Sequence, residues 1–126
     1  MGKKILVVDD EAPILTIMQA RLKANGYEVI TAMDGQEGLH KARSEKPDLI
    51  ILDVMLPKMD GYRVAQILKL DDQFKQIPIM MCSAKVQDDE RKAGMQVGAN
   101  AYLTKPFQSE VLLNKVKELL GETSPA

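Results

Sequence analysis

Short apolar stretches alternate along this chain with longer stretches whose apolar residues have helical spacing. The short stretches are rich in branched side chains, which favours strands at 5–8, 27–32, 49–52, 77–82 and, more weakly, 101–103. Strands that alternate with helices pair in parallel through right-handed crossovers, and strands that are apolar throughout are covered on both faces. The sequence therefore predicts an α/β fold of five βα units, with a doubly wound parallel sheet between two helical layers.

The length of 126 residues fits one domain and leaves no room for a second core. We assign residues 1–121 to this domain and expect 122–126 to form a disordered tail. Gly26, Gly98 and Gly121 stand where predicted helices end, and glycine readily adopts the left-handed backbone conformation that terminates helices.

Charge and cysteine content limit the classes of partner. The formal net charge of -1 gives no electrostatic argument for direct nucleic-acid binding or for an anionic membrane. The single cysteine, Cys82, excludes an internal disulfide, and its apolar surroundings favour a core residue over a redox thiol. The apolar runs are too short to insert into a membrane, and residues 1–4 do not resemble a signal peptide. We therefore expect a cytoplasmic protein.

Polar residues follow the predicted strands at the positions where an open α/β sheet forms its crevice, beyond the carboxyl ends of the strands. The sets are Asp9-Asp10-Glu11, Asp53, Ser83-Ala84 and Thr104-Lys105-Pro106. Each set also has a structural interpretation. Asp10 or Ser83 could cap a helix, Asp53 could bond to a turn, and Lys105 could be a solvated surface residue.

Several carboxylates on one crevice repel one another unless a cation neutralises them. Mg²⁺ suits such a site, because it binds one or two carboxylates, retains water ligands and accepts phosphate oxygens. Lys105 would add a second positive charge for a transferring phosphoryl group, and Ser83 would add a hydrogen bond. The set therefore points to phosphoryl transfer with Asp53 as a carboxylate nucleophile.

Four motifs follow one another along the chain: residues 5–11, residues 48–57 with Met59-Asp60-Gly61, residues 81–84, and Lys105-Pro106-Phe107. In this order they resemble the receiver domains of two-component response regulators. The resemblance covers nearly the whole chain. It implies a flavodoxin-like strand order of 2-1-3-4-5.

The resemblance also implies roles for individual residues. Asp53 would be the phosphoacceptor, taking the phosphoryl group from a sensor histidine kinase or a histidine phosphotransfer protein. Asp10, Asp53 and the backbone carbonyl of Met55 would bind Mg²⁺ directly, and Asp9 would act through a metal-bound water. Lys105 would pair with the phosphoryl group.

The resemblance further implies a cis peptide bond between Lys105 and Pro106 and a conformational switch. Ser83 would move toward the phosphoryl group, and the ring of Tyr102 would follow inward. The surface formed by the fourth helix, the fifth strand and the fifth helix would then bind an unknown downstream protein. The run 88–92 would be the solvated start of that fourth helix.

Two other interpretations stay open. An aspartyl-phosphate phosphohydrolase would need a second acid two residues after Asp53, where this chain has Met55, so we expect a signalling switch that catalyses only its own phosphorylation and dephosphorylation. Alternatively, the chain could be the receiver portion of a larger transcription factor. Such receivers often carry an acidic pair where this chain has Asn100-Ala101, which favours a stand-alone, chemotaxis-like or phosphorelay-like regulator, either a monomer or a weak dimer.

Overall fold

The computed structural model describes residues 2–84 and 98–122. Its centre is a parallel sheet of five strands in the order β2-β1-β3-β4-β5. The strands are β1 (Lys4–Val8), β2 (Glu28–Ala32), β3 (Leu49–Asp53), β4 (Ile79–Ser83) and β5 (Ala101–Thr104). This confirms the five predicted strands and their order.

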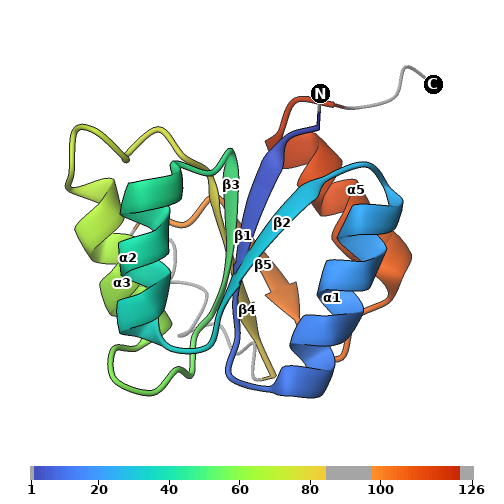
Figure 1. Cartoon of the computed structure of the whole chain (residues 1–126), viewed down its shortest axis with the longest axis horizontal. Helices are drawn as coiled ribbons and strands as arrows, with labels where there is room; N and C mark the ends of the chain where they lie inside the picture. The colour runs from blue at the N-terminus through green and yellow to red at the C-terminus, as the bar shows by residue number, and fades with distance from the viewer. Residues whose placement is uncertain (1, 85–97, 123–126) are drawn as a thin grey trace.

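Helices cover both faces of the sheet (Figure 1). On one face lie α1 (Ala12–Ala24) and α5 (Ser109–Leu119), and on the other lie α2 (Gly35–Glu45) and α3 (Gly61–Lys69). The predicted doubly wound α/β architecture is therefore confirmed. The expected fourth helix, including the run 88–92, lies outside the described residues.

Each strand supplies both layers of the core, because successive side chains point to opposite faces of a sheet. Leu6 and Leu52 pack toward α2 and α3, whereas Val7 and Ile51 pack toward α1 and α5. Every residue of β3 and β4 is buried, as continuous apolar runs predict for central parallel strands. Cys82 belongs to this core, as expected, and burial raises the pKa of its thiol to about 12.

Two of the predicted helix ends lie within the described residues. Gly26 and Gly121 directly follow the C-cap residues of α1 and α5, and their φ values of 89° and 71° lie in the region that favours glycine. Gly98 has a φ of 93°, but the helix expected before it lies outside the described residues. The interpretation of Asp10 as a helix cap is wrong, because α1 has Glu11 at its N-cap, without a side-chain cap hydrogen bond. Within the described ranges, none of the helices combines the length and apolar character that crossing a bilayer requires.

The end of α5 is attached to the body of the domain. The Tyr27 hydroxyl donates a hydrogen bond to Glu122 Oε1 at 2.9 Å, and the backbone N–H of Glu122 donates to the carbonyl of Lys117 at 2.7 Å. Residues 123–126 lie outside the described part of the chain. The domain boundary at residue 121 and the disordered tail stay predictions.

Candidate functional site

The parallel register gathers the predicted polar residues at one edge of the sheet. Asp53 ends β3 opposite Cys82, and Ser83 ends β4 opposite Thr104, directly before Lys105. Asp9 follows β1, whose last residue is paired with the residue before Asp53. A cleft of about 460 Å³ opens at this edge, and its lining residues are Asp10, Glu11, Asp53, Met55, Ser83, Ala84 and Lys105.

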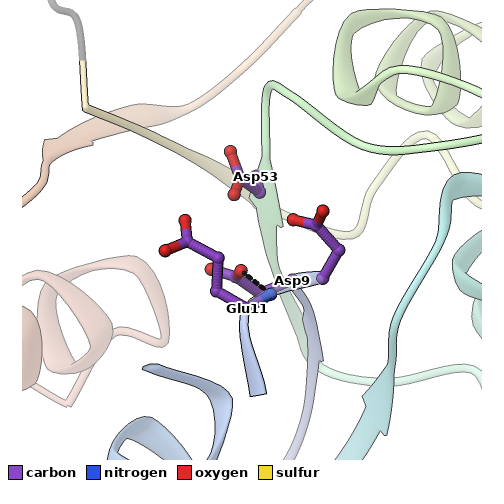
Figure 2. A group of neighbouring side chains, drawn as sticks. Asp9, Glu11 and Asp53 are labelled. Atoms are coloured by element: carbon purple, nitrogen blue, oxygen red, sulfur yellow. Dashed lines mark hydrogen bonds between the residues drawn. The ribbon is translucent and has the colours of Figure 1, made fainter. Parts of the chain in front are cut away.

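The acidic side chains converge. Asp9, Asp10, Glu11 and Asp53 each offer an oxygen, and these oxygens all lie within 4.8 Å of one another. Figure 2 shows three of these side chains side by side at the ends of β1 and β3. Asp9 and Asp53 are buried, at 2% and 4% exposure, whereas Asp10 and Glu11 are exposed to solvent. The cluster therefore has a buried floor and a solvent-facing rim.

Backbone N–H groups hold the two buried carboxylates in place. The N–H of Glu11 donates to Asp9 Oδ1 at 2.9 Å (Figure 2), and the N–H of Met55 donates to Asp53 Oδ1 at 3.1 Å. The turn interpretation of Asp53 is therefore correct as far as it goes. The turn accounts for the hydrogen bond to Oδ1 of Asp53, and Oδ2 is directed at the other side chains of the site.

Lys105 provides the positive charge on the cleft wall. Its Nζ donates to Asp9 Oδ2 at 2.7 Å, to Asp53 Oδ2 at 2.9 Å and to Glu11 Oε1 at 3.2 Å. The Lys105 side chain is only 7% exposed, so the interpretation as a solvated surface lysine is wrong. The backbone of Lys105 is also fixed, because its N–H donates a hydrogen bond to the carbonyl of Ser83 at 2.8 Å. The Lys105–Pro106 peptide bond is cis, as expected.

Burial and neighbouring charges have opposite effects on the pKa values of Asp53 and Lys105. Burial raises the pKa of Asp53 above its ordinary value, although the hydrogen bonds from Lys105 and from the N–H of Met55 act to lower it. For Lys105 burial acts to lower the pKa, but the hydrogen bonds and charges of Asp9 and Asp53 outweigh it and raise the pKa. Lys105 therefore stays protonated, whereas its charge and hydrogen bond do not fully offset the cost of burying the negative charge of Asp53.

The donor set suits a hard divalent cation. The cluster contains four carboxylates and the Lys105 ammonium contacts three of them, so negative charge remains in excess among the described side chains. All of the acidic ligand atoms are oxygens, which Mg²⁺ prefers over the nitrogen and sulfur ligands of softer metals. The residues at this edge therefore fit a magnesium site.

The two residues of the expected switch lie in different places. Ser83 is 3% exposed and lines the cleft, beside the Asp53 strand. Tyr102, on β5, is half-buried and packs against the core on the side of α2 and α3. Its hydroxyl lies 3.1 Å from the hydroxyl of Tyr62 on α3. The structure thus brings Ser83, but not the Tyr102 ring, into the cleft lining.

Sequence reasoning missed two contacts. The sequence pattern gives Glu11 no role beyond membership of the acidic run, yet its carboxylate contacts Lys105 and lies within the cluster. Its position directly after Asp10 was a usable signal, because the turn after β1 projects neighbouring side chains over the same edge. Tyr62 gave no signal, since its partner is 40 residues away.

The sequence matches known proteins along its whole length. Residues 5–117 match the family model of the response regulator receiver domain. Over 126 residues the chain is 50% identical to the alkaline phosphatase synthesis transcriptional regulatory protein PhoP of Bacillus subtilis, covering 100% of this chain and 52% of PhoP. It is 42% identical to the phosphate regulon transcriptional regulatory protein PhoB of Pseudomonas aeruginosa, covering 99% of this chain and 55% of PhoB. The chain spans about half the length of these curated relatives.

Solved structures show the same architecture. The chemotaxis protein CheY4 of Vibrio cholerae superposes with a TM-score of 0.90 at 37% identity, covering 95% of this chain and 100% of that one. The receiver domain of the sensor histidine kinase PA1611 from Pseudomonas aeruginosa gives a TM-score of 0.89 at 30% identity, covering 96% and 99%, and has a magnesium ion coordinated in its active site cleft. With the family model matching residues 5–117, this chain belongs to the response regulator receiver domain family.

Proposed function

We propose that Asp53 accepts a phosphoryl group from the phosphohistidine of a sensor histidine kinase or a histidine phosphotransfer protein. The observation that carries the proposal is the buried Asp53 carboxylate, which lines an open cleft while Lys105 and the N–H of Met55 hold its two oxygens. A carboxylate oxygen of Asp53 attacks phosphorus, and the phosphorus–nitrogen bond breaks with its electron pair returning to the imidazole. The product is an acyl phosphate.

In this proposal Asp10, Asp53 and the backbone carbonyl of Met55 hold Mg²⁺, and Asp9 acts through water. The proposal is supported by the convergence of the four acidic side chains and by the place of Met55 in the cleft lining. When bound, the ion would neutralise charge on the carboxylates and on the phosphoryl oxygens. Glu11 would remain at the solvent-facing rim, in contact with Lys105.

Lys105 and Ser83 complete the proposed site. The Lys105 ammonium already donates to the acceptor carboxylate, so little movement would be needed for it to pair with a phosphoryl oxygen on Asp53. Ser83 lines the same cleft and would donate a hydrogen bond to another oxygen. Preorganised donors of this kind favour the charge that develops during transfer.

The proposed output follows from the position of Ser83 at the end of β4. As Ser83 moves toward the phosphoryl group, the Tyr102 ring on β5 would move inward and change the surface of β5 and α5 together with the expected fourth helix. A downstream protein would recognise this surface. Direct binding of nucleic acid is not part of this proposal, nor is insertion into a membrane.

The wider setting is also proposed. We place the protein in the cytoplasm, as a monomer or weak dimer. The alignment covers the whole solved CheY4 chain but only 52% of PhoP, so the stand-alone form and the receiver portion of a longer regulator both stay predictions.

The phosphohydrolase alternative has less support. Met55, two residues after Asp53, is 75% exposed and has no proton to give to a leaving group. The remaining acids at the cleft belong to the cluster that fits Mg²⁺. A switch that catalyses only its own phosphorylation and dephosphorylation therefore accounts better for the cleft.

Mass spectrometry after incubation with acetyl phosphate and Mg²⁺ tests the acceptor. The protein should gain one phosphoryl group, and Asp53→Asn should gain none. Asp60→Asn is a matched control. The Asp60 side chain caps α3 by accepting a hydrogen bond from the backbone N–H of Arg63 at 3.0 Å, and asparagine can accept the same bond. Labelling that persists in Asp53→Asn would refute the assignment.

A further inference from the structure

The loop between β3 and α3 is contacted from outside by the start of α2. The backbone N–H of Gly35, the first residue of α2, donates a hydrogen bond to the carbonyl of Pro57 at 3.2 Å. Beside this bond, Lys58 Nζ lies 3.6 Å from Oδ2 of Asp34, the N-cap residue of the same helix. The turn that follows β2 therefore holds the middle of the loop that follows Asp53.

The contact leaves no room for a side chain at position 35. A Cβ atom built on Gly35 would overlap the carbonyl oxygen of Met59. The overlapped atom belongs to the backbone, so it cannot rotate away as the end of a flexible side chain can. A larger residue in place of Gly35 would therefore displace either the loop or the start of α2.

The start of α2 is firmly fixed. The Asp34 side chain accepts a hydrogen bond from the N–H of Glu37 at 2.7 Å, and Glu37 Oε1 accepts one from the N–H of Met33 at 2.8 Å. These two bonds close the turn before the helix, as in a capping box. One turn further along, a Cβ atom at Gly38 would lie 2.9 Å from Cγ1 of Val8, so α2 packs closely on β1. A side chain added at the helix start would consequently displace the loop.

The loop carries the Met55 carbonyl, which is the proposed backbone ligand of Mg²⁺. The Met55 side chain is 75% exposed, so its own packing does little to fix this residue. Leu56 and Met59 pack against the core layer of α2 and α3, and the ring of Pro57 fixes one backbone angle of the loop. A shift at the contact with α2 is therefore passed back along the loop. The direction of the Met55 carbonyl thus depends on Gly35.

We propose that Gly35 is a positioning residue for the metal site, because it sets the place of the loop that carries the Met55 carbonyl. The proposal rests on the function proposed above, since it assumes that this carbonyl binds Mg²⁺. Gly35 lies outside the cleft lining, so it acts only through the loop. Loss of a contact that orients a metal ligand typically lowers metal affinity by about 10- to 100-fold. We expect the lower end of this range, because the carboxylates of Asp10 and Asp53 are not displaced with the loop.

Magnesium titration of two glycine variants tests the positioning role. Gly35→Ala should need about 10-fold more MgCl2 for half-saturation than the wild type, followed by backbone amide NMR signals at constant ionic strength. Gly38→Ala is the matched control, because it adds the same methyl group to the same helix but against the Val8 side chain. The control should lose stability and keep the wild-type midpoint. An unchanged midpoint in Gly35→Ala, or an equal loss of affinity in both variants, would overturn the proposal.

A measurement on the wild type does not depend on whether Gly35→Ala folds. By linkage, bound Mg²⁺ strengthens the contact by the same factor by which the contact strengthens Mg²⁺ binding. Saturating MgCl2 should therefore slow hydrogen exchange of the Gly35 N–H by up to about 10-fold. Exchange of the Lys46 N–H, which donates to the Ala42 carbonyl at the other end of α2, should not change.

The exchange experiment separates failure of this inference from failure of the proposed function. Unchanged exchange at Gly35, or equal slowing at Gly35 and Lys46, in a protein whose NMR signals show that Mg²⁺ is bound would overturn the positioning role alone. A wild type whose signals do not respond to MgCl2 would overturn the proposed magnesium site, and the role of Gly35 with it.

Discussion

Adjacent residues of β3 illustrate two kinds of buried environment. Leu52 is 0% exposed and packs in the core layer of α2 and α3, whereas Asp53 is 4% exposed and lies in the acidic cluster. Burial of Leu52 stabilises the fold, while burial of Asp53 raises the pKa of its carboxyl because the charge is poorly solvated. One step along the strand therefore separates a side chain that supports the fold from one whose unfavourable environment is available for chemistry.

The largest expected effect falls on the apolar side of this comparison. Leu52→Ala should lower the free energy of unfolding by about 2–5 kcal/mol, because it removes buried methyl groups and leaves a cavity among well-packed neighbours. Urea denaturation followed by circular dichroism measures this change. Leu70→Ala is the matched control, since Leu70 is 78% exposed and should change stability little. Equal losses in the two variants would contradict the described packing.

Removal of the ammonium group should have the next largest effect. Lys105→Met should lower the free energy of unfolding by about 2 kcal/mol without Mg²⁺, because Asp9 and Asp53 lose their charged donor. Added Mg²⁺ should restore part of this loss. Lys23→Met changes an exposed lysine of α1 and serves as the control in the same urea titrations. A Lys105→Met protein as stable as the control would show that the buried ion pairs contribute little.

Magnesium should stabilise the carboxyl edge and leave the apolar layers unaffected. At ten times its dissociation constant the ion would add about 1.4 kcal/mol to the free energy of unfolding. Thermal denaturation in MgCl2, compared with NaCl at equal ionic strength, measures the gain. Asp10→Asn should reduce it by removing one proposed ligand, and Asp60→Asn should not. The same gain in Asp10→Asn and in the wild type would remove Asp10 from the ligand set.

The two environments also differ in how far the sequence predicted them. The continuous apolar runs of β3 and β4 predicted central strands covered on both faces, because burial depends on composition along a single segment. The positions of Asp9, Asp53, Ser83 and Lys105 followed from parallel pairing, which places strand ends at one edge. Contacts between individual side chains were harder to predict from the sequence. The meeting of Tyr62 with Tyr102 depends on helix placement and ring orientation, and no periodicity in the sequence reports on either.

The smallest expected effect concerns the pH dependence of stability. It depends on Asp53 alone of the two residues compared above, because Leu52 cannot titrate. Because burial raises the folded-state pKa of Asp53 above its ordinary value of 3.8, the folded protein retains, between the two pKa values, a proton that the unfolded chain has released. The favourable contribution is complete below the unfolded value and is lost as pH rises through the folded-state pKa, so the free energy of unfolding should fall over this interval. Asp53→Asn cannot titrate and should lack this component, while Asp60→Asn should keep it. Urea titrations at successive pH values with a chelator present measure the difference. If the curves of wild type and Asp53→Asn run parallel, desolvation of Asp53 does not dominate its environment, and Lys105 compensates the acceptor charge fully.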